Sequence, residues 1–157
     1  MGSAHPVFTN CLFNGNKGNY GGAIYNQASY YTQPGFSNPT IINCTFYGNE
    51  ADYGGACSLL SSQNSNTSAT VSNCIFWGNI ANVQRKNIHG GSGVSASYTL
   101  FDEPSCPTNI TCNSGILYNQ DPQFVDAANG DFHLQDCSPA INAGTSNNAP
   151  SDDLDGN

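Results

Sequence analysis

Basic side chains are scarce in this chain. Its 157 residues contain 3 Lys and Arg against 11 Asp and Glu, which gives a formal net charge of −8. A protein that acidic repels phosphate backbones and anionic lipid headgroups. The composition therefore argues against nucleic acid or a membrane surface as the partner.

Long apolar runs and helix-forming residues are also missing. No segment approaches the roughly 20 apolar residues of a membrane span, so we expect no membrane insertion in this part of the protein. Few Glu, Lys, Leu or Arg residues are present, and Gly, Pro and Asn interrupt every stretch, so no helix of ordinary length is expected. No signal peptide is visible, and the first three residues, Met-Gly-Ser, are typical of a cloning remnant. We therefore expect a piece of a longer protein.

The chain does have a repeated phrase, Asn-Cys-x-Phe-x-Gly-Asn, at 10–16, 43–49 and 73–79. A second phrase, Gly-Gly-Ala, starts eight residues after the phenylalanine in the first two copies, at Gly21 and Gly54. Phrases that recur at a period of 30 to 33 residues with a fixed offset are typical of stacked-repeat proteins. We expect each copy to form one layer of a stack.

Each repeat has the pattern of short strands joined by turns. In the segment 40–46, Ile42, Cys44 and Phe46 alternate with polar residues, which indicates a half-buried strand with these three side chains on its inner face. The Gly-Asn pair that follows suits a turn. Two or three such strands make one turn of a parallel β-helix.

The predicted fold is therefore all-β, a single-stranded parallel β-helix of about four to five coils. The coils are expected over residues 1–117, and a C-terminal coil or cap region over 118–157. The variable segments 27–39 and 61–69 are expected to be loops at one edge of the coil, where insertions are tolerated.

Equivalent positions of the repeated phrase should stack inside the coil. Strands lie about 4.8 Å apart, slightly more than the Cβ separation of about 3.5–4.5 Å in a disulfide, so the stacked cysteines are predicted to be free thiols. Asparagine amides should hydrogen-bond from coil to coil. The expected rows are Cys11, Cys44 and Cys74; Phe13, Phe46 and Phe76; and Asn16, Asn49 and Asn79.

Cys106 and Cys112 belong to a different, turn-rich segment. Their spacing allows a small disulfide loop, which would imply an oxidising compartment. Free thiols at both positions are the alternative.

Two sets of phrases carry a resemblance to known families. The Phe-x-x-Asn phrases at 13–16, 46–49 and 76–79, with Gly-Gly-Ala-Ile at 21–24, resemble the polymorphic outer-membrane-protein repeat. The phrases at 121–126, 129–134, 137–144 and 153–157 are similar to the C-terminal part of bacterial surface proteins of the choice-of-anchor Q type. That resemblance implies a right-handed, pectin-lyase-like parallel β-helix in an exported protein, and it supplies no general catalytic motif.

Catalytic groups are not defined by spacing. A lyase needs a base and a cation, and Arg85, Lys86 and His89 do cluster in the third repeat, where a solvated loop is the alternative reading. A glycosidase needs two facing carboxylates, whereas adjacent residues in a strand point to opposite faces. The carboxylates available by type are Glu50, Asp52, Asp102 and Glu103.

Acidic residues near the C-terminus form the one candidate metal site. Asp153 and Asp155 offer oxygen ligands at alternate positions before a glycine, as calcium loops do. A plain acidic turn is the alternative, because the full loop and its distal Glu are missing. Asp121, Asp126 and Asp131 are expected to cap turns.

Aromatic residues on the outer face form the candidate binding surface. Tyr47 and Trp77 occupy equivalent positions in successive repeats, and Tyr53 follows nearby. Such a platform could stack on sugar rings or on a neighbouring chain, or it could be ordinary cross-strand packing.

From the sequence we expect a non-enzymatic module at the cell surface or outside the cell, acting as a stalk or adhesin. Its expected partners are a glycan or a neighbouring chain, and no cofactor is expected apart from the calcium considered above. A fragment of a polysaccharide lyase or glycoside hydrolase is the first alternative. The second is a filament that assembles end to end through open strand edges.

Overall fold

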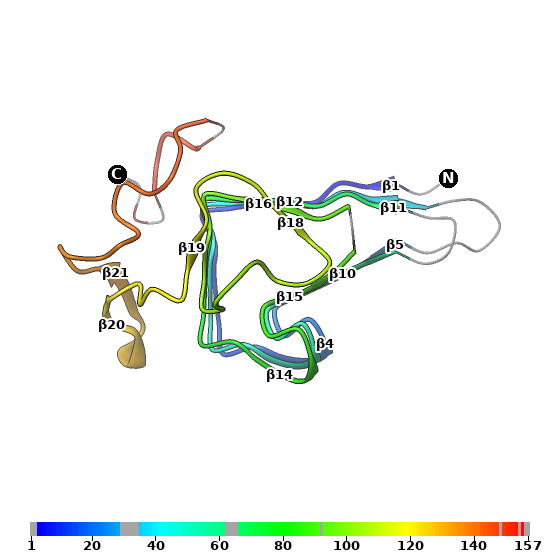
Figure 1. Ribbon diagram of the computed structural model, residues 1–157, viewed down its shortest axis with the longest axis horizontal. Coiled ribbons are helices and arrows are strands. Elements are labelled where there is room, and N and C mark those ends of the chain that lie inside the picture. The colour runs from blue at the N-terminus through cyan, green and yellow to red at the C-terminus, as the bar shows by residue number, and fades with distance from the viewer. Residues whose placement is uncertain are drawn as a thin grey trace.

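The computed structural model describes residues 3–28, 35–61, 66–91, 93–147, 149–153 and 155. Within these residues the protein is all-β, and the only helical element is the short 3₁₀ turn η1 (Ala127–Asn129). The strands are two to five residues long, and nearly all of them pair in parallel with the equivalent strand of the next repeat (Figure 1).

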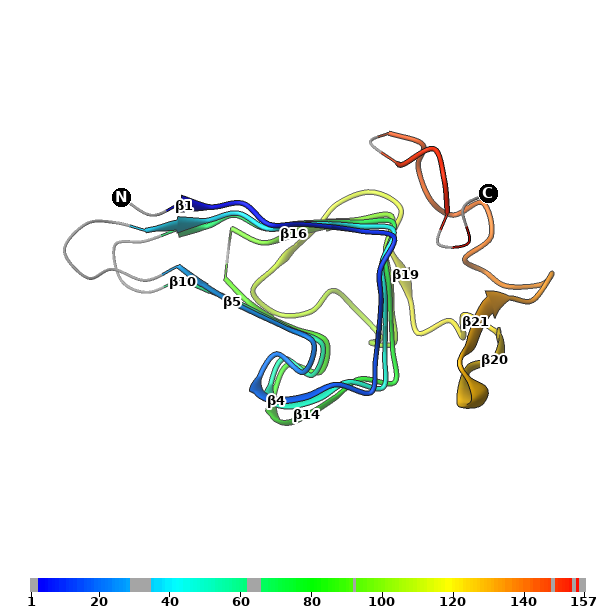
Figure 2. The same ribbon diagram turned by 180° about the vertical axis from the view of Figure 1, so that it is seen from behind.

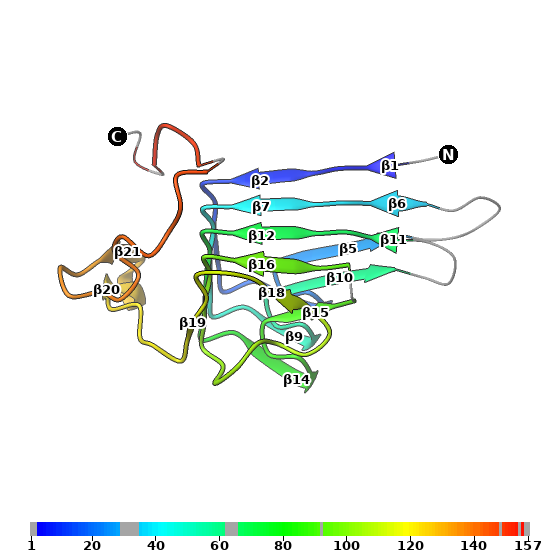
Figure 3. The same ribbon diagram turned by 45° about the horizontal axis from the view of Figure 1, so that its top comes forward.

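Two five-stranded parallel sheets share a common edge of the stack. The first contains, in order, β2 (Val7–Thr9), β7 (Thr40–Ile42), β12 (Thr70–Ser72), β16 (Ser95–Ser97) and β18 (Thr111–Cys112). The second, which we call the groove sheet, contains β3 (Leu12–Asn14), β8 (Thr45–Tyr47), β13 (Ile75–Trp77), β17 (Leu100–Phe101) and β19 (Leu117–Tyr118). Figure 3 shows β2, β7, β12 and β16 lying side by side in the stack, so equivalent residues of successive repeats become neighbours.

Three smaller parallel sheets complete the repeats. They contain β1 (Ser3–Ala4), β6 (Phe36–Ser37) and β11 (Asn66–Thr67); β4 (Lys17–Tyr20), β9 (Glu50–Tyr53) and β14 (Ile80–Gln84); and β5 (Ile24–Ala28), β10 (Cys57–Ser61) and β15 (Ile88–Gly90).

The segments 27–39 and 61–69 are not entirely loops, as the sequence had suggested. Their ends contribute to β5 and β10, and they contain β6 and β11, which pair with each other in register. These strands show no apolar alternation because their buried residues, Ser37 and Thr67, are polar, whereas Phe36 is 41% exposed. Residues 29–34 and 62–65 of the expected loops lie outside the described residues.

A corner at Asn43 decides which side chains face inward. Asn43 lies between β7 and β8 with a φ of +52°, a left-handed conformation that asparagine tolerates better than most residues. Ile41 and Cys44 are fully buried, whereas Ile42 is only half-buried. The prediction of one strand over 40–46 with Ile42 inside is therefore wrong, because a period of two does not continue through a corner.

Phenylalanine rings form a continuous stack through the core. The ring centroids of Phe13 and Phe46 are 4.7 Å apart, those of Phe46 and Phe76 are 4.6 Å apart, and those of Phe76 and Phe101 are 5.2 Å apart. Phe101 extends the row into a repeat that lacks the cysteine phrase. The row predicted from three phrases thus has a fourth member.

The cysteines of the phrase form a second row of free thiols. Cys44 and Cys74 are buried and Cys11 is half-buried. Each Sγ donates to the backbone carbonyl two residues earlier in the chain, at 3.2, 3.2 and 3.1 Å for Cys11, Cys44 and Cys74. Burial raises the pKa of the Cys74 thiol well above its usual value, so this thiol packs as a small apolar group.

A directional chain of side-chain hydrogen bonds, which we call the asparagine row, crosses the repeats. The Nδ2 of Asn16 donates to Asn49 Oδ1 at 2.9 Å, Asn49 Nδ2 to Asn79 Oδ1 at 3.0 Å, Asn79 Nδ2 to Asn87 Oδ1 at 3.0 Å, and Asn87 Nδ2 to Asp102 Oδ1 at 2.8 Å. Asn49, Asn79 and Asn87 are fully buried. The structure therefore holds the three predicted asparagines together and adds Asn87 and Asp102, which lie outside the repeated phrase.

Glycine is required at the turn between β9 and β10. Gly54 has a φ of +67°, and a Cβ added there would lie 2.1 Å from the carbonyl oxygen of Cys57 and 2.8 Å from the His89 backbone nitrogen. In the third repeat the equivalent position is Arg85, with a φ of +61°. The strand before Arg85, β14, pairs with β9 in an irregular register. The third repeat therefore keeps the turn without the Gly-Gly-Ala phrase.

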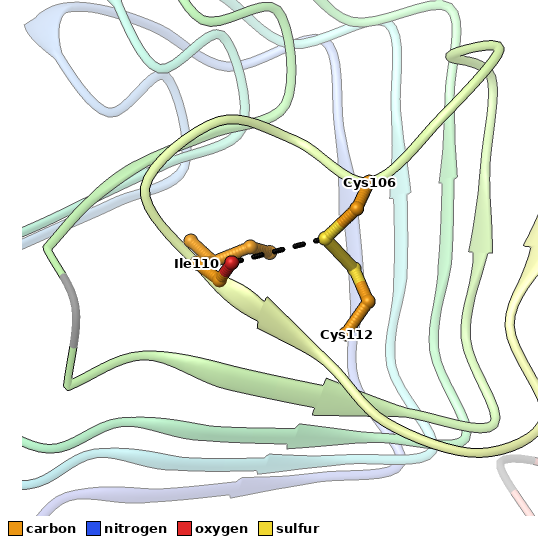
Figure 4. Close-up of a disulfide and its surroundings, with 3 residues drawn as sticks. All are labelled: Cys106, Ile110 and Cys112. Carbon is orange, nitrogen blue, oxygen red and sulfur yellow. Dashed lines mark hydrogen bonds between the residues drawn. A yellow bond between two sulfur atoms is a disulfide. The ribbon is translucent and has the colours of Figure 1, made fainter.

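A disulfide-closed loop lies across one end of the stack (Figures 1 and 2). Cys106 and Cys112 form the disulfide, the first of the two alternatives that the sequence left open (Figure 4). Within the loop Pro107 is buried, and Ile110 packs against the core together with Cys112. The loop thus covers apolar side chains that the last complete repeat would otherwise expose.

The C-terminal region changes from parallel to antiparallel pairing. β20 (Phe124–Asp126) and β21 (Asp131–Leu134) form an antiparallel pair, which we call the hairpin, beside the groove sheet. The last parallel strand, β19, ends at Tyr118 and so spans the boundary expected between residues 117 and 118. Beyond the hairpin, Thr145 exchanges two backbone hydrogen bonds with the Asn73 side chain, at 2.8 and 3.0 Å.

Candidate functional site

The outward faces of β8 and β13 meet the hairpin. Tyr47 and Trp77 are paired directly across these two strands. Phe124 and Phe132 from the hairpin pack edge-on against the Tyr47 ring, with centroid separations of 5.9 and 5.1 Å. Tyr47 is therefore an anchor for the hairpin, whereas no aromatic ring of the described residues packs on Trp77, and both side chains border a space beside the hairpin.

That space is a groove of about 410 Å³ between the groove sheet and the hairpin, and we call it the tryptophan groove. Trp77 and Tyr47 form its aromatic side. Its remaining lining residues are Asp121, Gln123, Phe124, Ala127 and Gln135.

Polar groups of the tryptophan groove are only partly used by the protein itself. Asp121 Oδ1 accepts from the Gln123 backbone N–H at 2.8 Å, and Gln135 Nε2 donates to the Phe124 carbonyl at 3.0 Å. Among the described residues, Asp121 Oδ2, Gln135 Oε1 and the Gln123 side-chain amide make no further hydrogen bond. The groove thus pairs an aromatic face with polar atoms able to bind hydroxyl groups.

Tyr53 does not belong to this surface. It lies on β9 and stacks on Tyr20, with ring centroids 5.0 Å apart and an interplanar angle of 11°. It also stacks on His89 at 5.5 Å. The expected platform of Tyr47, Trp77 and Tyr53 is therefore wrong as a single surface, because the corner at Gly48, with a φ of +61°, turns β9 onto another sheet.

A second groove, of about 470 Å³, lies between the two five-stranded sheets and the C-terminal region and contains His133. The His133 ring bridges two carboxylates: Nδ1 contacts Asp131, and Nε2 lies 2.8 Å from Asp155 Oδ2. The hydrogen bonds to Asp131 and Asp155 raise the pKa of His133 above its usual value. This contact ties the end of the chain to the hairpin.

The expected calcium ligands are used in these local contacts. The Asp155 backbone N–H donates to Asp153 Oδ1 at 2.9 Å, while the Asp155 carboxylate faces His133. Over the part of the chain that the structure describes, no group of three His, Cys, Asp or Glu side chains could hold a metal ion. Residues 154, 156 and 157 of the expected loop lie outside the described residues.

Asp121 and Asp126 cap turns, as predicted: Asp121 accepts from the Gln123 backbone N–H, and Asp126 from that of Asn129 at 3.4 Å. The same prediction is wrong for Asp131, which lies in β21 and accepts from the His133 backbone N–H of the same strand at 3.1 Å. The sequence had given Asp121 no other role. Asp121 lines the groove only because the hairpin folds back onto the groove sheet.

The cationic cluster of the third repeat is divided between a core contact and a small pocket of about 220 Å³, which Arg85 lines together with Glu103. Lys86 Nζ lies 2.9 Å from Asp102 Oδ2 and neutralises the carboxylate at the end of the asparagine row. Arg85 and His89 are half-buried, so the expected solvated loop is wrong for these two residues. Burial, and secondarily the charge of Asp102, raises the pKa of Glu103.

The fold and the tryptophan groove define an all-β protein of stacked parallel repeats with an aromatic site on its flank. The chain belongs to the family described as Domain of unknown function (DUF5123), whose model matches residues 39–146, more than half of its length. No curated protein and no solved structure matches the chain. No helix within the described residues is long and apolar enough to span a membrane.

Proposed function

We propose that this chain is a carbohydrate-binding module of an exported bacterial surface protein, built as a right-handed, single-stranded parallel β-helix of four to five coils with a C-terminal cap. In-register parallel pairing of equivalent strands supports the coil, and the two five-stranded sheets support the number of coils. The antiparallel hairpin would be the cap.

The observation that carries the binding function is the tryptophan groove. A sugar ring offers an apolar face of C–H groups and a rim of hydroxyls, and it is bound best by an aromatic ring with hydrogen-bonding groups beside it. Trp77 supplies the ring, and Asp121, Gln123 and Gln135 supply the polar groups. The site is shallow and has one free aromatic face, so we expect binding in the millimolar to high-micromolar range, about −4 to −6 kcal/mol.

Two further features favour an exported, non-catalytic module. The Cys106–Cys112 disulfide suits an oxidising environment outside the cytoplasm. Of the residues that line the tryptophan groove, Asp121 alone is a carboxylate, whereas glycoside hydrolysis ordinarily uses two carboxylates on either side of the bond. A stalk or adhesin that displays the groove at the cell surface fits both features.

Trp77 is the single tryptophan of the chain, so its fluorescence reports on the groove directly. A panel of soluble oligosaccharides is titrated against the protein, and we expect at least one to give a saturable spectral change. Calorimetry with that sugar should lose its heat signal in Trp77→Ala. Tyr25→Ala is the matched control, because Tyr25 is 51% exposed on a different sheet, and it should bind normally.

The same samples test the alternatives. Shortened or unsaturated sugars released during the titration would establish an enzyme, and growth of particle size in light scattering would establish a self-assembling protein. Binding that survives in a folded Trp77→Ala variant would place the site elsewhere and overturn this proposal.

A further inference from the structure

The charge of the tryptophan groove limits which sugars it can accept. Of its lining residues Asp121 alone carries a charge, and no Lys, Arg or His lines it. The chain as a whole carries a net charge of −8. A sugar acid placed on Trp77 would therefore meet a like charge with no cation beside it.

Hydrogen bonding in the tryptophan groove favours the same class of ligand. The Asp121 carboxylate can only accept hydrogen bonds. Gln135 gives one N–H of its Nε2 to the Phe124 carbonyl, which leaves its second N–H and its Oε1 acceptor for a ligand. The Gln123 side-chain amide likewise offers both donors and an acceptor. Because the two glutamines can serve either kind of partner, the acceptor-only Asp121 carboxylate decides the preference: it suits an O–H or N–H group of the ligand, whereas a carboxylate or sulfate group offers it no donor.

We infer that the tryptophan groove selects uncharged and amine-bearing sugars and rejects acidic ones, with Asp121 as the residue that sets this preference. The inference rests on the proposed carbohydrate-binding function and adds the ligand class. The Asp121 carboxylate would attract an ammonium group of an amino sugar and would repel the carboxylate of a sugar acid.

A matched series of ligands tests the charge alone. The probes are β-1,4-linked tetramers of glucose, glucuronate and glucosamine, titrated at low salt and about pH 6, where carboxylates are ionised and amines are protonated. For charges about 4 to 6 Å apart near a protein surface, each step of one unit charge along this series should shift the dissociation constant about fivefold or more. The expected order of affinity is glucosamine, then glucose, then glucuronate.

The variant Asp121→Asn should collapse this order to within about twofold. Its side-chain oxygen can still accept the Gln123 N–H, so the turn that carries it should persist. Asp52→Asn removes the same charge from β9, on a different sheet, and should leave the order unchanged. This control separates the local carboxylate from the net charge of the chain.

The outcomes distinguish the two proposals. If wild-type protein binds the three tetramers equally, or binds glucuronate best, charge selection is wrong while carbohydrate binding stands. If Asp121→Asn keeps the wild-type order, the preference does not arise from Asp121. If none of the three changes the Trp77 fluorescence or produces heat in calorimetry, both this inference and the proposed binding at Trp77 are overturned.

Discussion

A buried side-chain amide costs free energy when its donor or its acceptor is left unsatisfied, and in the asparagine row the buried amides use both. Asn49 Nδ2 donates to Asn79 and also to the Phe13 carbonyl at 2.9 Å, while Asn49 Oδ1 accepts from Asn16. Loss of the Asn49 side chain removes the partner of the Asn16 backbone N–H and of the Phe13 carbonyl, and each unsatisfied group costs about 1–3 kcal/mol.

Asn49→Ala should therefore lower the free energy of unfolding by about 2–4 kcal/mol. Urea unfolding followed by circular dichroism measures the change, and sugar binding to the folded variant should be unaltered. Asn82→Ala is the control, because Asn82 is exposed and its side chain hydrogen-bonds only at the surface, to Asp52 at 3.4 Å and to Glu50. A change below about 0.5 kcal/mol at Asn49 would show that the row does not hold the repeats together.

At the scale of the element, the turn between β9 and β10 depends on backbone shape. The carbonyl of Cys57 and the backbone of His89 approach Gly54 so closely that a Cβ has no room. The positive φ adds a second penalty for any other residue.

Gly54→Ala should destabilise the protein by about 2 kcal/mol or more, since the Cβ would force β10 to move. The matched control is Gly91→Ala, where an added Cβ meets no atom within 4 Å. Thermal unfolding of the two variants compares them directly. Equal melting temperatures for Gly54→Ala and the wild-type protein would mean that the turn relaxes freely.

Repeated phrases predict which residues share a row, but they do not predict where a strand bends. The phenylalanine, cysteine and asparagine rows follow from equal spacing, because in-register parallel strands place equivalent residues side by side. The corner at Asn43 depends on a single dihedral angle, and its available sign was the asparagine before each phrase cysteine, because Asn10, Asn43 and Asn73 all have a positive φ. The outward face of Tyr47 was foreseeable, but its burial under Phe124 and Phe132 was not, because that contact joins segments far apart in the chain.

At the scale of the whole molecule, the contact of His133 with Asp131 and Asp155 holds the end of the chain against the hairpin. The Asp131 and Asp155 carboxylates raise the pKa of His133, and the His133 contact lowers the pKa of Asp131. Because the pKa of His133 is higher in the folded state than in the unfolded state, its contacts stabilise the protein fully at a pH below the unfolded-state pKa. This stabilisation is lost as the pH rises through the folded-state pKa. The lowered aspartate pKa adds stability that is lost as pH falls through its folded value. The contact is strongest between these two limits.

We therefore expect the end of the chain to loosen from the hairpin as pH rises through the folded pKa of His133. Proton NMR of the His133 ring measures that pKa, and Asp155→Asn should lower it. Asp136→Asn removes an exposed carboxylate from the same region and should not change it. Hydrogen exchange at the Asp155 amide, which donates to Asp153, should quicken over the same pH range. A His133 pKa that is identical in Asp155→Asn would contradict this account.

The asparagine row has a polarity that limits how the stack can be lengthened. Every amide donates toward Asp102, and a carboxylate has no N–H to pass on, so the sequence of bonds stops there. At the opposite end, the Asn16 side chain is exposed and its oxygen can accept from one more asparagine. Copies of the repeat inserted on the Asn16 side of the stack would continue the row, whereas copies added beyond Asp102 would have to start a new one. Protein engineering can thus lengthen the existing row from the Asn16 end only, because the Asp102 carboxylate ends it.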